Sequence, residues 1–393
     1  MKLALIGVGQ AGGTIVDQFA QHDAELEQPI VADAMVVNTS KSDLAALRYL
    51  PRERRLLIGQ AEVDGHGVGT DNKLATQLMT EDISEVTTLL NSMSLDTVEA
   101  FLVIGSLGGG TGSGGAPVII DTIQSKYDQP VYSTAILPHT SEGTHFALNA
   151  ARSLKTIEEH ADSVILFDNA VYSDDEDLES MYPDINADII TRLGALFSLD
   201  ELGTKLAFND DSIQTDELRN ALELEGHVTL SYRTDVPREP EDIGIIGKIK
   251  QVTPEIPGTE EHVEAVTKMA VQESQSITSN TNRAQKILYL AVVPEGYSSK
   301  SVLNRGAEWI RNETLDTEVV GRMYVPEESV AELVALVVFA GVDESQRLRG
   351  LTQSGLDALR FGGNVHEPSE EQRMELFMQE SPESSDAKIE TLF

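Results

Sequence analysis

Gly108-Gly109-Gly110-Thr111-Gly112-Ser113-Gly114-Gly115 lies between an apolar run, Ala100–Gly105, and a segment with helical periodicity, Ala116–Lys126. Six of these eight residues are glycine, so the backbone there can come very close to a ligand. A glycine-rich turn between a strand and a helix also gathers backbone N–H groups and a helix N-terminus around one point, which suits phosphate. A flexible linker has a similar composition, but linkers seldom lie directly between a strand and a helix. We therefore predict a phosphate-binding loop at Gly108–Gly115.

A second glycine cluster, Gly7-Val8-Gly9-Gln10-Ala11-Gly12-Gly13, follows the apolar run Leu3–Val8. Gly-x-Gly-x-x-Gly after a strand is the dinucleotide-binding fingerprint, which also expects an acid at the end of the second strand. Here the second apolar run, Ala34–Asn38, is followed by Thr39 and Ser40, and no Gly-Lys-Ser/Thr occurs anywhere in the chain. Two separate glycine loops on parallel strands indicate a nucleoside triphosphate held without a P-loop lysine. A Rossmann oxidoreductase is the disfavoured alternative.

Strands alternate with helices through the first half, which predicts a parallel sheet with helices on both faces. The later strands are Val131–Leu137 and Ser163–Phe167, separated by a helix around Phe146–His160. Ile185–Leu202 has the spacing of a long connecting helix. Beyond Gly226, β-rich runs (Lys286–Val293 and Leu333–Val342) surround a helical segment (Ser299–Asn312) and predict a second α+β domain. We predict four parts: residues 1–182 as the nucleotide-binding domain, 183–225 as the central helix with a catalytic loop, 226–365 as the α+β domain, and 366–393 as a flexible acidic tail.

The charge of the chain limits its partners. It has 65 acidic and 29 basic residues, for a net charge of −36, and nucleic-acid affinity comes mainly from Lys and Arg contacts to phosphates. We therefore expect no nucleic-acid partner. At molar salt the Debye length falls to about 3 Å and self-repulsion is screened, so halophilic adaptation explains the charge better than a ligand does.

Other bulk features exclude several kinds of site. The chain has no cysteine, which rules out disulfides and thiolate metal sites. No apolar run approaches the ~18 residues of a membrane-spanning helix, and the N-terminal segment is too short for a secretory signal. We expect a cytoplasmic protein without a transmembrane segment, which would reach a membrane only through other proteins.

The two glycine clusters resemble those of one protein family. Gly9-Gln10-Ala11-Gly12 and Gly108-Gly109-Gly110-Thr111-Gly112-Ser113-Gly114 are similar to two loops of the tubulin/FtsZ superfamily, and the second is its signature loop as tubulins carry it. The chain looks most like the CetZ branch found in halophilic archaea, which agrees with the charge. The resemblance runs from residue 1 to about 345 and includes Glu332–Gly341, which is similar to a late strand of FtsZ's second domain. It implies a tubulin/FtsZ-like α/β fold: a parallel-sheet GTPase domain, a long central helix, a second α+β domain and an acidic tail.

The resemblance implies that the ligand is GTP or GDP, with Mg²⁺ bound to the nucleotide and no certain direct metal ligand from the protein. The residues that match nucleotide contacts are Gly9, Gln10, Ala11, Gly12, Gly13, Thr14, Asn38, Gly108, Gly109, Gly110, Thr111, Gly112, Ser113, Glu142, Asn169, Tyr182 and Asn186.

Two further loops match family loops around the phosphates and the sugar. Gly67–Asn72 is similar to the loop that senses the terminal phosphate, with Asp71 and Asn72 near the metal or phosphate. Pro138 and Glu142-Gly143 resemble the ribose loop, in which Glu142 contacts the sugar. An arginine that FtsZ carries four residues later is replaced by Phe146, which leaves that contact open.

The resemblance also implies how the base is read. Asn169 matches the residue that reads the guanine edge, Tyr182 would stack on the base, and Asn186 would hydrogen-bond it as in tubulin. If FtsZ's pattern applied instead, Asp188 would take the place of Asn186. A carboxamide offers both a donor and an acceptor, which distinguishes guanine from adenine. Isolated Asn residues are more often caps or turns, so this reading requires Asn169 and Asn186 to converge on one base.

In this superfamily the acid that activates water comes from the next subunit. The matching segment is Ser212–Arg219, and the acid falls at Glu217, with Asp216 as the alternative. The family's Asn becomes Ser212 and one of its Asp residues becomes Gln214, departures that would slow hydrolysis. The alternative interpretation of Glu217 is a solvated surface acid in an acid-rich chain.

Together the residues and the resemblance predict a GTP-hydrolysing cytoskeletal protein that assembles head to tail with itself and contributes to cell shape in a haloarchaeon. A subunit with nucleotide at one end and the acid at the other makes a contact that propagates as a filament. Residues 366–393 show no match to the terminal peptide of FtsZ, so we expect a shape role rather than a division ring. The alternative function is a nucleotide-binding regulator or scaffold with weak or no GTPase activity, suggested by Ser212 and Gln214.

Overall fold

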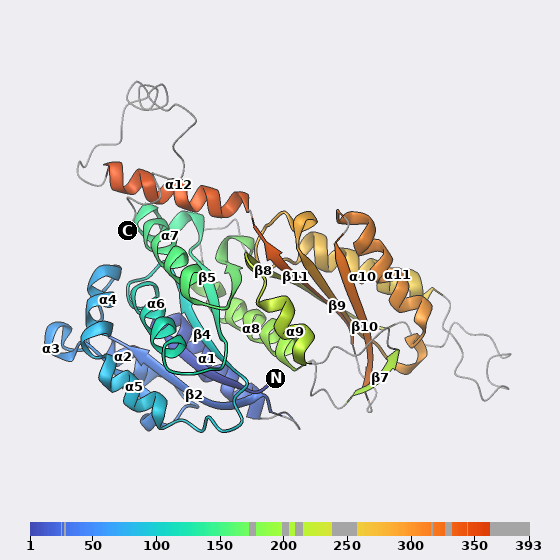
Figure 1. Ribbon diagram of the computed structural model, residues 1–393. Coiled ribbons are helices and arrows are strands. Elements are labelled where there is room, and N and C mark those ends of the chain that lie inside the picture. The colour runs from blue at the N-terminus through green and yellow to red at the C-terminus, as the bar shows by residue number, and fades with distance from the viewer. Residues whose placement is uncertain are drawn as a thin grey trace, which may run out of the picture.

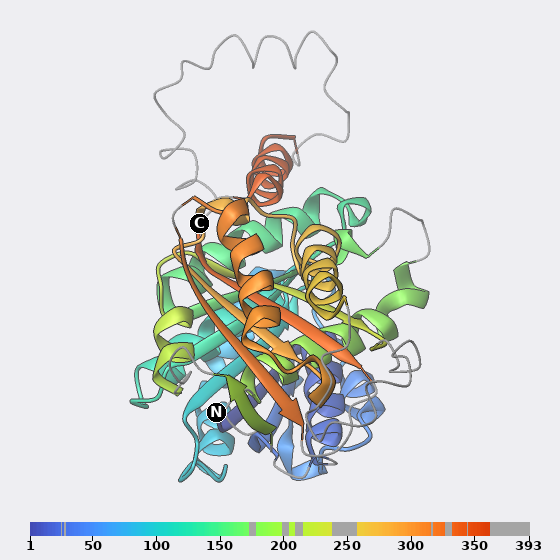
Figure 2. The same cartoon turned by 90° about the vertical axis from the view of Figure 1, so that its right-hand side faces the viewer.

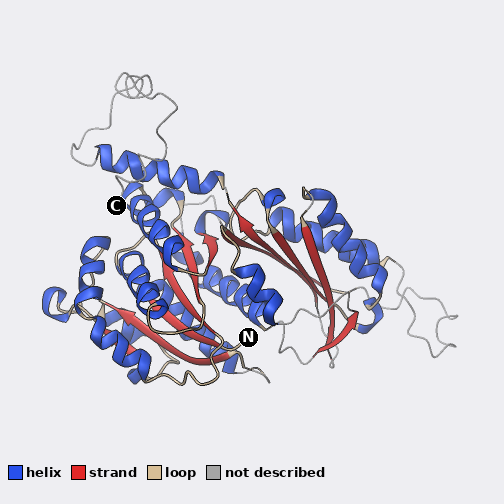
Figure 3. Ribbon diagram, viewed as in Figure 1, coloured by secondary structure: helices blue, strands red, loops and turns tan. Residues whose placement is uncertain are grey.

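The computed structural model describes residues 1–24, 26, 29–172, 178–198, 204–208, 215–237, 258–315, 317–326, 332–343 and 345–361 (Figure 1). Within these residues one 11-stranded sheet runs through the molecule in the order β3-β2-β1-β4-β5-β6-β8-β11-β9-β10-β7. Figure 3 shows the strands in red with helices packed against them on both sides.

The first six strands are parallel, as the alternation of strands and helices predicts. Helices on both faces bury the inner strands, so these strands read as continuous apolar runs. Successive residues of β1 alternate between the two cores: Leu3 and Leu5 face one, and Ala4 and Ile6 the other. The strands are β1 (Leu3–Val8), β2 (Val31–Asn38), β3 (Arg55–Leu57), β4 (Ala100–Ser106), β5 (Val131–Leu137) and β6 (Ser163–Asp168).

Helices cover each face of this half. One face packs against α1 (Gly9–Ala24) and α8 (Leu178–Phe197). The other face packs against α4 (Asn72–Glu81), α5 (Ile83–Asn91), α6 (Thr111–Gln124) and α7 (Thr144–His160). Short elements join these helices and strands: α2 (Lys41–Ala46), α3 (Gln60–Val63), and the 3-10 helices η1 (Arg52–Arg54), η2 (Thr140–Glu142) and η3 (Asn169–Val171).

The second half continues the same sheet with mixed strand directions. β8 pairs in parallel with β6, β11 runs antiparallel to β8 and β9, β10 is parallel to β9, and β7 is antiparallel to β10. These strands are β7 (Thr204–Phe208), β8 (His227–Asp235), β9 (Lys286–Val292), β10 (Glu318–Pro326) and β11 (Leu333–Val342).

The helices of the second half lie on both sides of its strands. Figure 2 looks onto this half and shows the gold helix α10 and the orange helix α11 lying across the outer face of the strands. α9 packs on the opposite face, and α12 returns to the first half, where Ala358 contacts Leu148 and Ala151 of α7. The helices are α9 (Thr215–Leu222), α10 (Thr259–Glu273), α11 (Lys300–Glu313) and α12 (Gln346–Phe361), with the 3-10 helices η6 (Thr281–Arg283) and η7 (Glu295–Tyr297).

A single apolar cluster joins the two halves. It contains Leu3 of β1 and Phe19 of α1 together with Leu290 of β9 and Leu336 of β11, and α8 contributes the residues between them, among them Leu193. The expected connecting helix is therefore a shared wall of both halves.

Two predicted helix boundaries were wrong. The long helix begins at Leu178 rather than Ile185, because Pro183 lies inside it instead of marking its start. The helix predicted to follow the glycine stretch Gly108–Gly115, which is α6, begins at Thr111 rather than at Ala116. The bounds expected for the four parts of the chain stay predictions, and residues 366–393 lie outside the described residues.

Candidate nucleotide-binding site

The order of the strands makes the boundary between β1 and β4 a topological switch point, where open α/β sheets form a crevice outside the strand ends. The chain builds β2 and β3 on one side of β1 and then crosses over to β4 on the other side. In open α/β sheets, ligands bind outside the carboxyl ends of the strands at such a switch point. Both predicted glycine clusters lie there, because α1 begins at Gly9 directly after β1 and α6 begins at Thr111 shortly after β4.

The N-termini of α1 and α6 meet at this crevice. Gly9 has φ +75°, and a Cβ added there would lie 2.9 Å from the backbone nitrogen of Gly112. Only glycine allows this approach. The N–H groups in the first turn of each helix have no acceptor within their own helix, so both sets of donors and both helix dipoles act on the same space. The arrangement favours an anion with several oxygens.

Most glycines of the signature stretch are required by packing. A Cβ at Gly112 would lie 2.5 Å from the Ser106 carbonyl oxygen, and one at Gly114 would lie 2.2 Å from the Asn72 carbonyl oxygen. These two residues belong to α6, so the loop itself is shorter than predicted and ends at Gly110. These glycines let α6 pack tightly on β4 and α4, and the predicted contact of Gly112 with a nucleotide stays a prediction.

Gly109 differs from its neighbours. A Cβ added there would meet no atom within 4 Å, and its φ lies outside the left-handed region. By contrast, a Cβ at Gly108 would lie 2.8 Å from Pro138 Cβ, and one at Gly110 would lie 2.5 Å from the Gly69 carbonyl oxygen. The protein itself therefore has no steric need for glycine at position 109. An open position between tightly packed neighbours is what a ligand lying against the backbone requires.

Side chains around the loop hold its shape. Asn149 of α7 is 5% exposed, and its Nδ2 donates to the carbonyl oxygens of Thr70 (2.8 Å) and Gly108 (3.0 Å). The Ser113 hydroxyl donates to the carbonyl oxygens of Gly109 and Gly110. Ser113, predicted to contact the nucleotide, thus directs its side chain to the loop. Asn149 was not predicted, although an Asn among alanines on the apolar face of a helix is a detectable signal.

The loops after β2 and before α4 complete this end of the crevice. The Thr39 and Thr111 hydroxyls are 2.8 Å apart, and Gly110 N donates to the Gly69 carbonyl (3.1 Å), so the predicted phosphate-sensing loop lies against the signature loop. The Asn38 side chain accepts from the backbone N–H of Thr39 and so shapes its own turn. Asp71 caps α4 by accepting from Leu74 N.

The predicted ribose loop lies beside Gly108. A Cβ at Gly108 would come within 3.0 Å of Phe146 as well as of Pro138. The carboxylate of Glu142 accepts from His139 N at 2.5 Å. Burial raises the pKa of Glu142, and the His139 N–H and the charges of His139 and Arg347 act in the opposite direction.

A buried ion pair that was not predicted fixes this loop to the next strand. Arg347 of α12 donates from Nε to Asp168 Oδ2 at 2.7 Å, and its Nη2 donates to the Pro138 carbonyl. The side chains are 16% and 2% exposed. Asp168 also accepts from Ala170 N, so one carboxylate orders the turn that carries Asn169.

The two predicted base-reading amides are free to bind a ligand. Asn169 is 6% exposed and Asn186 is partly buried, and within the described part of the chain neither carboxamide has a hydrogen-bond partner. Asp188, the alternative to Asn186, accepts from the Tyr172 hydroxyl (2.6 Å) and from Arg192 Nε (2.7 Å). Burial, reinforced by the Asp188 charge, raises the pKa of Tyr172. This geometry favours Asn186 over Asp188.

Comparison with known proteins identifies the family. Residues 2–174 match the GTPase domain of the Tubulin/FtsZ family, and residues 175–357 match the C-terminal domain of tubulin-like CetZ. Tubulin-like protein CetZ1 of Haloferax volcanii is 34% identical over 366 residues, which cover 91% of this chain and 92% of the relative. The chain belongs to the tubulin/FtsZ family.

Solved structures of CetZ proteins share the fold. This tubulin/FtsZ protein aligns with the GDP-bound monomer of CetZ1 from Haloferax volcanii at TM-score 0.78 and 33% identity, covering 91% of this chain and 100% of that one. It aligns with the GTPγS-bound protofilament of CetZ2 from the same organism at TM-score 0.79 and 31% identity, covering 93% and 100%. The predicted family and fold class are confirmed.

The predicted catalytic acid of this family member is bonded to a buried arginine. Glu217 Oε2 accepts from Arg322 Nη2 at 2.8 Å, and the side chains are 29% and 1% exposed. The segment is helical from Thr215 rather than a loop throughout. The alternative interpretation of Glu217 as a solvated surface acid therefore does not describe it fully, because its carboxylate pairs with the buried guanidinium of Arg322. Ser212, Gln214 and the Asp216 side chain lie outside the described residues.

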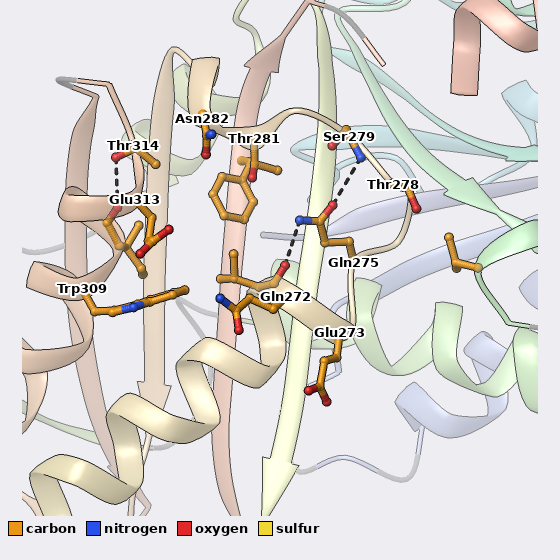
Figure 4. A pocket seen from close by; sticks show the side chains of 14 residues that line it. Gln272, Glu273, Gln275, Thr278, Ser279, Thr281, Asn282, Trp309, Glu313 and Thr314 are labelled. Atoms are coloured by element: carbon orange, nitrogen blue, oxygen red, sulfur yellow. Dashed lines mark hydrogen bonds between the residues drawn. The ribbon is translucent and has the colours of Figure 1, made fainter. Parts of the chain in front are cut away.

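A cavity of about 440 Å³ lies in the second half of the protein, apart from the glycine loops (Figure 4). Trp309 and Glu313 of α11 and Gln272 near the end of α10 line it, and it reaches Val171, two residues after Asn169. None of the predicted site residues lines it.

No group of three or more His, Asp or Glu side chains in the described ranges is arranged to hold a metal ion. None of the described helices combines the length and apolar character needed to span a bilayer.

Proposed function

We propose that this chain binds GTP and GDP at the carboxyl ends of β1 and β4, and hydrolyses GTP where copies of the chain meet head to tail. The observation that carries the proposal is Gly109: the structure leaves space there, where the N-termini of α1 and α6 converge. The relatives support it, because CetZ1 was solved as a GDP-bound monomer and CetZ2 as a GTPγS-bound protofilament.

The backbone amides of Gly108–Gly110 and of the first turns of α1 and α6 would hold the phosphates. The α1 turn contains Gly9, Gln10, Ala11 and Gly12. Gly12 and Gly13 are buried against the strands, and as glycines they would contact the phosphates only through their backbone N–H groups. Mg²⁺ would arrive with the nucleotide, since it is usually bound through phosphates and few protein carboxylates.

The sugar and base would extend from the phosphates toward β6. Glu142 would hydrogen-bond the sugar, Tyr182 would stack on the base, and Asn169 and Asn186 would pair with the guanine edge. The engagement of Asp188 with Tyr172 and Arg192 supports Asn186 in this role. The two free carboxamides provide the donors and acceptors that guanine requires.

Hydrolysis would be completed in trans. Water attacks the γ-phosphorus, the bond to the β–γ bridging oxygen breaks, and GDP and phosphate leave. Glu217 of the next copy would orient the water and accept its proton. Arg322 would fix the position of the Glu217 carboxylate through the hydrogen bond from its Nη2 to Oε2.

The test combines two inactive proteins. Gly109→Ala should lack nucleotide but keep the acid, and Glu217→Gln should bind nucleotide but lack the acid, while its amide can still bond Arg322. Each protein alone should release little phosphate. Their mixture should regain part of the activity, because a nucleotide on one copy then meets Glu217 of the other.

Turnover per wild-type subunit should also rise with protein concentration. A Glu217→Gln protein with normal turnover would show that Glu217 serves only Arg322. A mixture that stays inactive, or turnover independent of concentration, would contradict the proposed trans mechanism.

At a finer level, we propose that the filaments form in the cytoplasm of a haloarchaeon and contribute to cell shape. The net charge of −36 and the similarity to the Haloferax volcanii CetZ proteins support this. Light scattering after addition of GTP should rise in molar KCl and not in dilute buffer. Nucleotide binding without any rise would favour the second candidate, a regulator or scaffold with weak hydrolysis, which Ser212 and Gln214 suggest.

A further inference from the structure

A cavity of about 490 Å³ lies between α4, α6 and α7, behind the phosphate loop. This is within the usual size range of small-molecule sites, ~300–1,000 Å³. Of the residues predicted near the nucleotide or its metal, Asn72 and Ser113 line it, whereas Gly108–Gly110 do not. The helix α6 therefore separates this cavity from the crevice at the ends of β1 and β4.

The charge of the cavity is opposite to that of the chain. Lys73 and Arg152 line it, in a protein with 65 acidic and 29 basic residues. Lys73 is exposed, and among the described side chains no carboxylate lies within ion-pair distance of it. The one acid on the wall, Asp121, lies 3.5 Å from His160 Nε2. An anion entering the cavity would therefore meet more positive than negative charge.

Ser153 provides a hydrogen-bond donor inside this wall. The residue is 3% exposed, and its Oγ is fully buried without a hydrogen-bond partner. A buried hydroxyl without a partner costs stability, and most such groups in proteins are satisfied by protein, water or ligand. Arg152 is itself partly buried, and this burial lowers the pKa of its guanidinium. The Ser153 hydroxyl would gain a partner from a bound acceptor, and the Arg152 guanidinium would add positive charge beside it.

The rest of the wall is apolar. Ile83 of α5 and Pro117 and Val118 of α6 line the cavity. We propose that this cavity binds an amphipathic organic anion, with a carboxylate, sulfonate or phosphate head at Lys73, Arg152 and Ser153 and an apolar body against Ile83, Pro117 and Val118.

The cavity is connected to the phosphate loop by hydrogen bonds. Thr76 lines it, and its hydroxyl lies 3.0 Å from both the Asn72 and the Gly114 carbonyl oxygens. Ser113 borders it and bonds the Gly110 carbonyl at 3.1 Å. A ligand that shifts α4 against α6 would change the loop, and by linkage the nucleotide would change the affinity for that ligand by the same factor. This second step rests on the proposed function, whereas the binding step does not.

The binding test uses 8-anilinonaphthalene-1-sulfonate, an aromatic sulfonate, as the probe. Its fluorescence is titrated on the full chain with saturating GDP, so that the nucleotide site is occupied. Lys73→Glu should weaken binding of the probe about tenfold or more, since the sulfonate then faces a like charge.

Ser153→Ala should weaken binding of the probe about threefold without lowering Tm, because no hydrogen bond within the protein is lost. Lys300→Glu makes the same charge change on α11 and should leave binding within about twofold of wild type.

The proposal is overturned if Lys73→Glu and Ser153→Ala bind the probe as wild type does, or if Lys300→Glu weakens it equally. The coupling step is tested by repeating the titration without nucleotide. Equal probe affinity with and without GDP would overturn the coupling and leave the site standing. If the chain binds no GDP at all, the proposed function fails, and the titration of the nucleotide-free variants still decides the cavity.

Discussion

Gly109 and Gly112 are three residues apart, yet a methyl group would have opposite consequences at the two positions. At Gly112 it would collide with the backbone of β4, whereas at Gly109 it would enter open space. The same contrast applies to two buried amides. Asn149 is bonded to loop carbonyls, and Asn169 has no partner among the described residues. At this scale, a residue that the fold does not need is the one to test for function.

Gly109→Ala should abolish tight nucleotide binding while the protein stays folded. The added methyl group meets no protein atom, so Tm should hold, but it would occupy the space of a phosphate. We expect at least about a tenfold loss of GTP affinity in calorimetric titration. Gly194 of α8 is the matched control, since a Cβ there also meets no atom within 4 Å. Gly194→Ala should leave affinity unchanged and stabilise the helix by about 0.5–1 kcal/mol.

Asn169→Ala and Asn149→Ala should separate binding from stability. Removing the Asn169 carboxamide breaks no protein hydrogen bond, so urea unfolding should change little while GTP affinity falls and discrimination against ATP narrows. Removing Asn149 leaves loop carbonyls without a donor and should cost about 1–3 kcal/mol. If Asn169→Ala binds GTP as wild type does, Asn169 does not read the base.

At the scale of elements, the Arg347–Asp168 ion pair holds α12 to the first half together with apolar contacts. Arg347→Met should destabilise the protein by about 3–5 kcal/mol, because it leaves the buried carboxylate of Asp168 without its partner. The double variant Arg347→Met/Asp168→Asn should recover part of this loss in urea unfolding. If the two single losses simply add, the pair is not coupled.

The first residue of β8 gives the fold a dependence on pH. Burial lowers the pKa of His227 to about 4, and its Nε2 has no hydrogen-bond partner among the described residues. The unfolded chain, with a pKa near 6.5, binds a proton in the window between these values and the native state does not. Stability therefore falls as pH falls from about 6.5 to 4. At pH 5.5 the loss should be about 1.4 kcal/mol relative to pH 8.

The check for His227 is the difference between wild type and His227→Gln in urea unfolding at each pH. Other groups titrate in both proteins, so only the difference belongs to His227. Parallel pH profiles for the two proteins would rule out this origin.

The elements that could be predicted best were those with a local signal. Val131–Leu137 and Leu333–Val342 were predicted at their observed bounds, because a buried strand bounded by polar residues is visible in its own residues. Helix starts at Thr111 and Leu178 were missed because glycines and Pro183 normally stop a helix. Arg347 had no local signal, since its partner Asp168 is 179 residues away.

At the scale of the whole molecule, the two halves share one sheet and one apolar cluster. β8 continues the parallel sheet from β6, and α8 packs against residues of both halves. The matches to two family domains therefore do not divide the core at residue 174.

Unfolding in urea should accordingly be one transition. Trp309, the only tryptophan of the chain, lies in α11 and reports the second half, whereas far-UV circular dichroism reports the whole protein. The two curves should coincide, because loss of either half exposes the shared cluster. A tryptophan transition at lower urea than the circular dichroism transition would show that the second half unfolds by itself.

The shared cluster also bears on synthesis at the ribosome. The wall that Leu3 and Phe19 help to form is completed only by Leu288, Leu290, Leu336 and Val338, which are translated more than 260 residues later. A nascent chain that has completed β1 to β6 thus exposes this apolar surface until nearly the whole polypeptide has emerged. Such a chain needs either rapid completion or a chaperone to shield it, and a truncated product would be prone to aggregate.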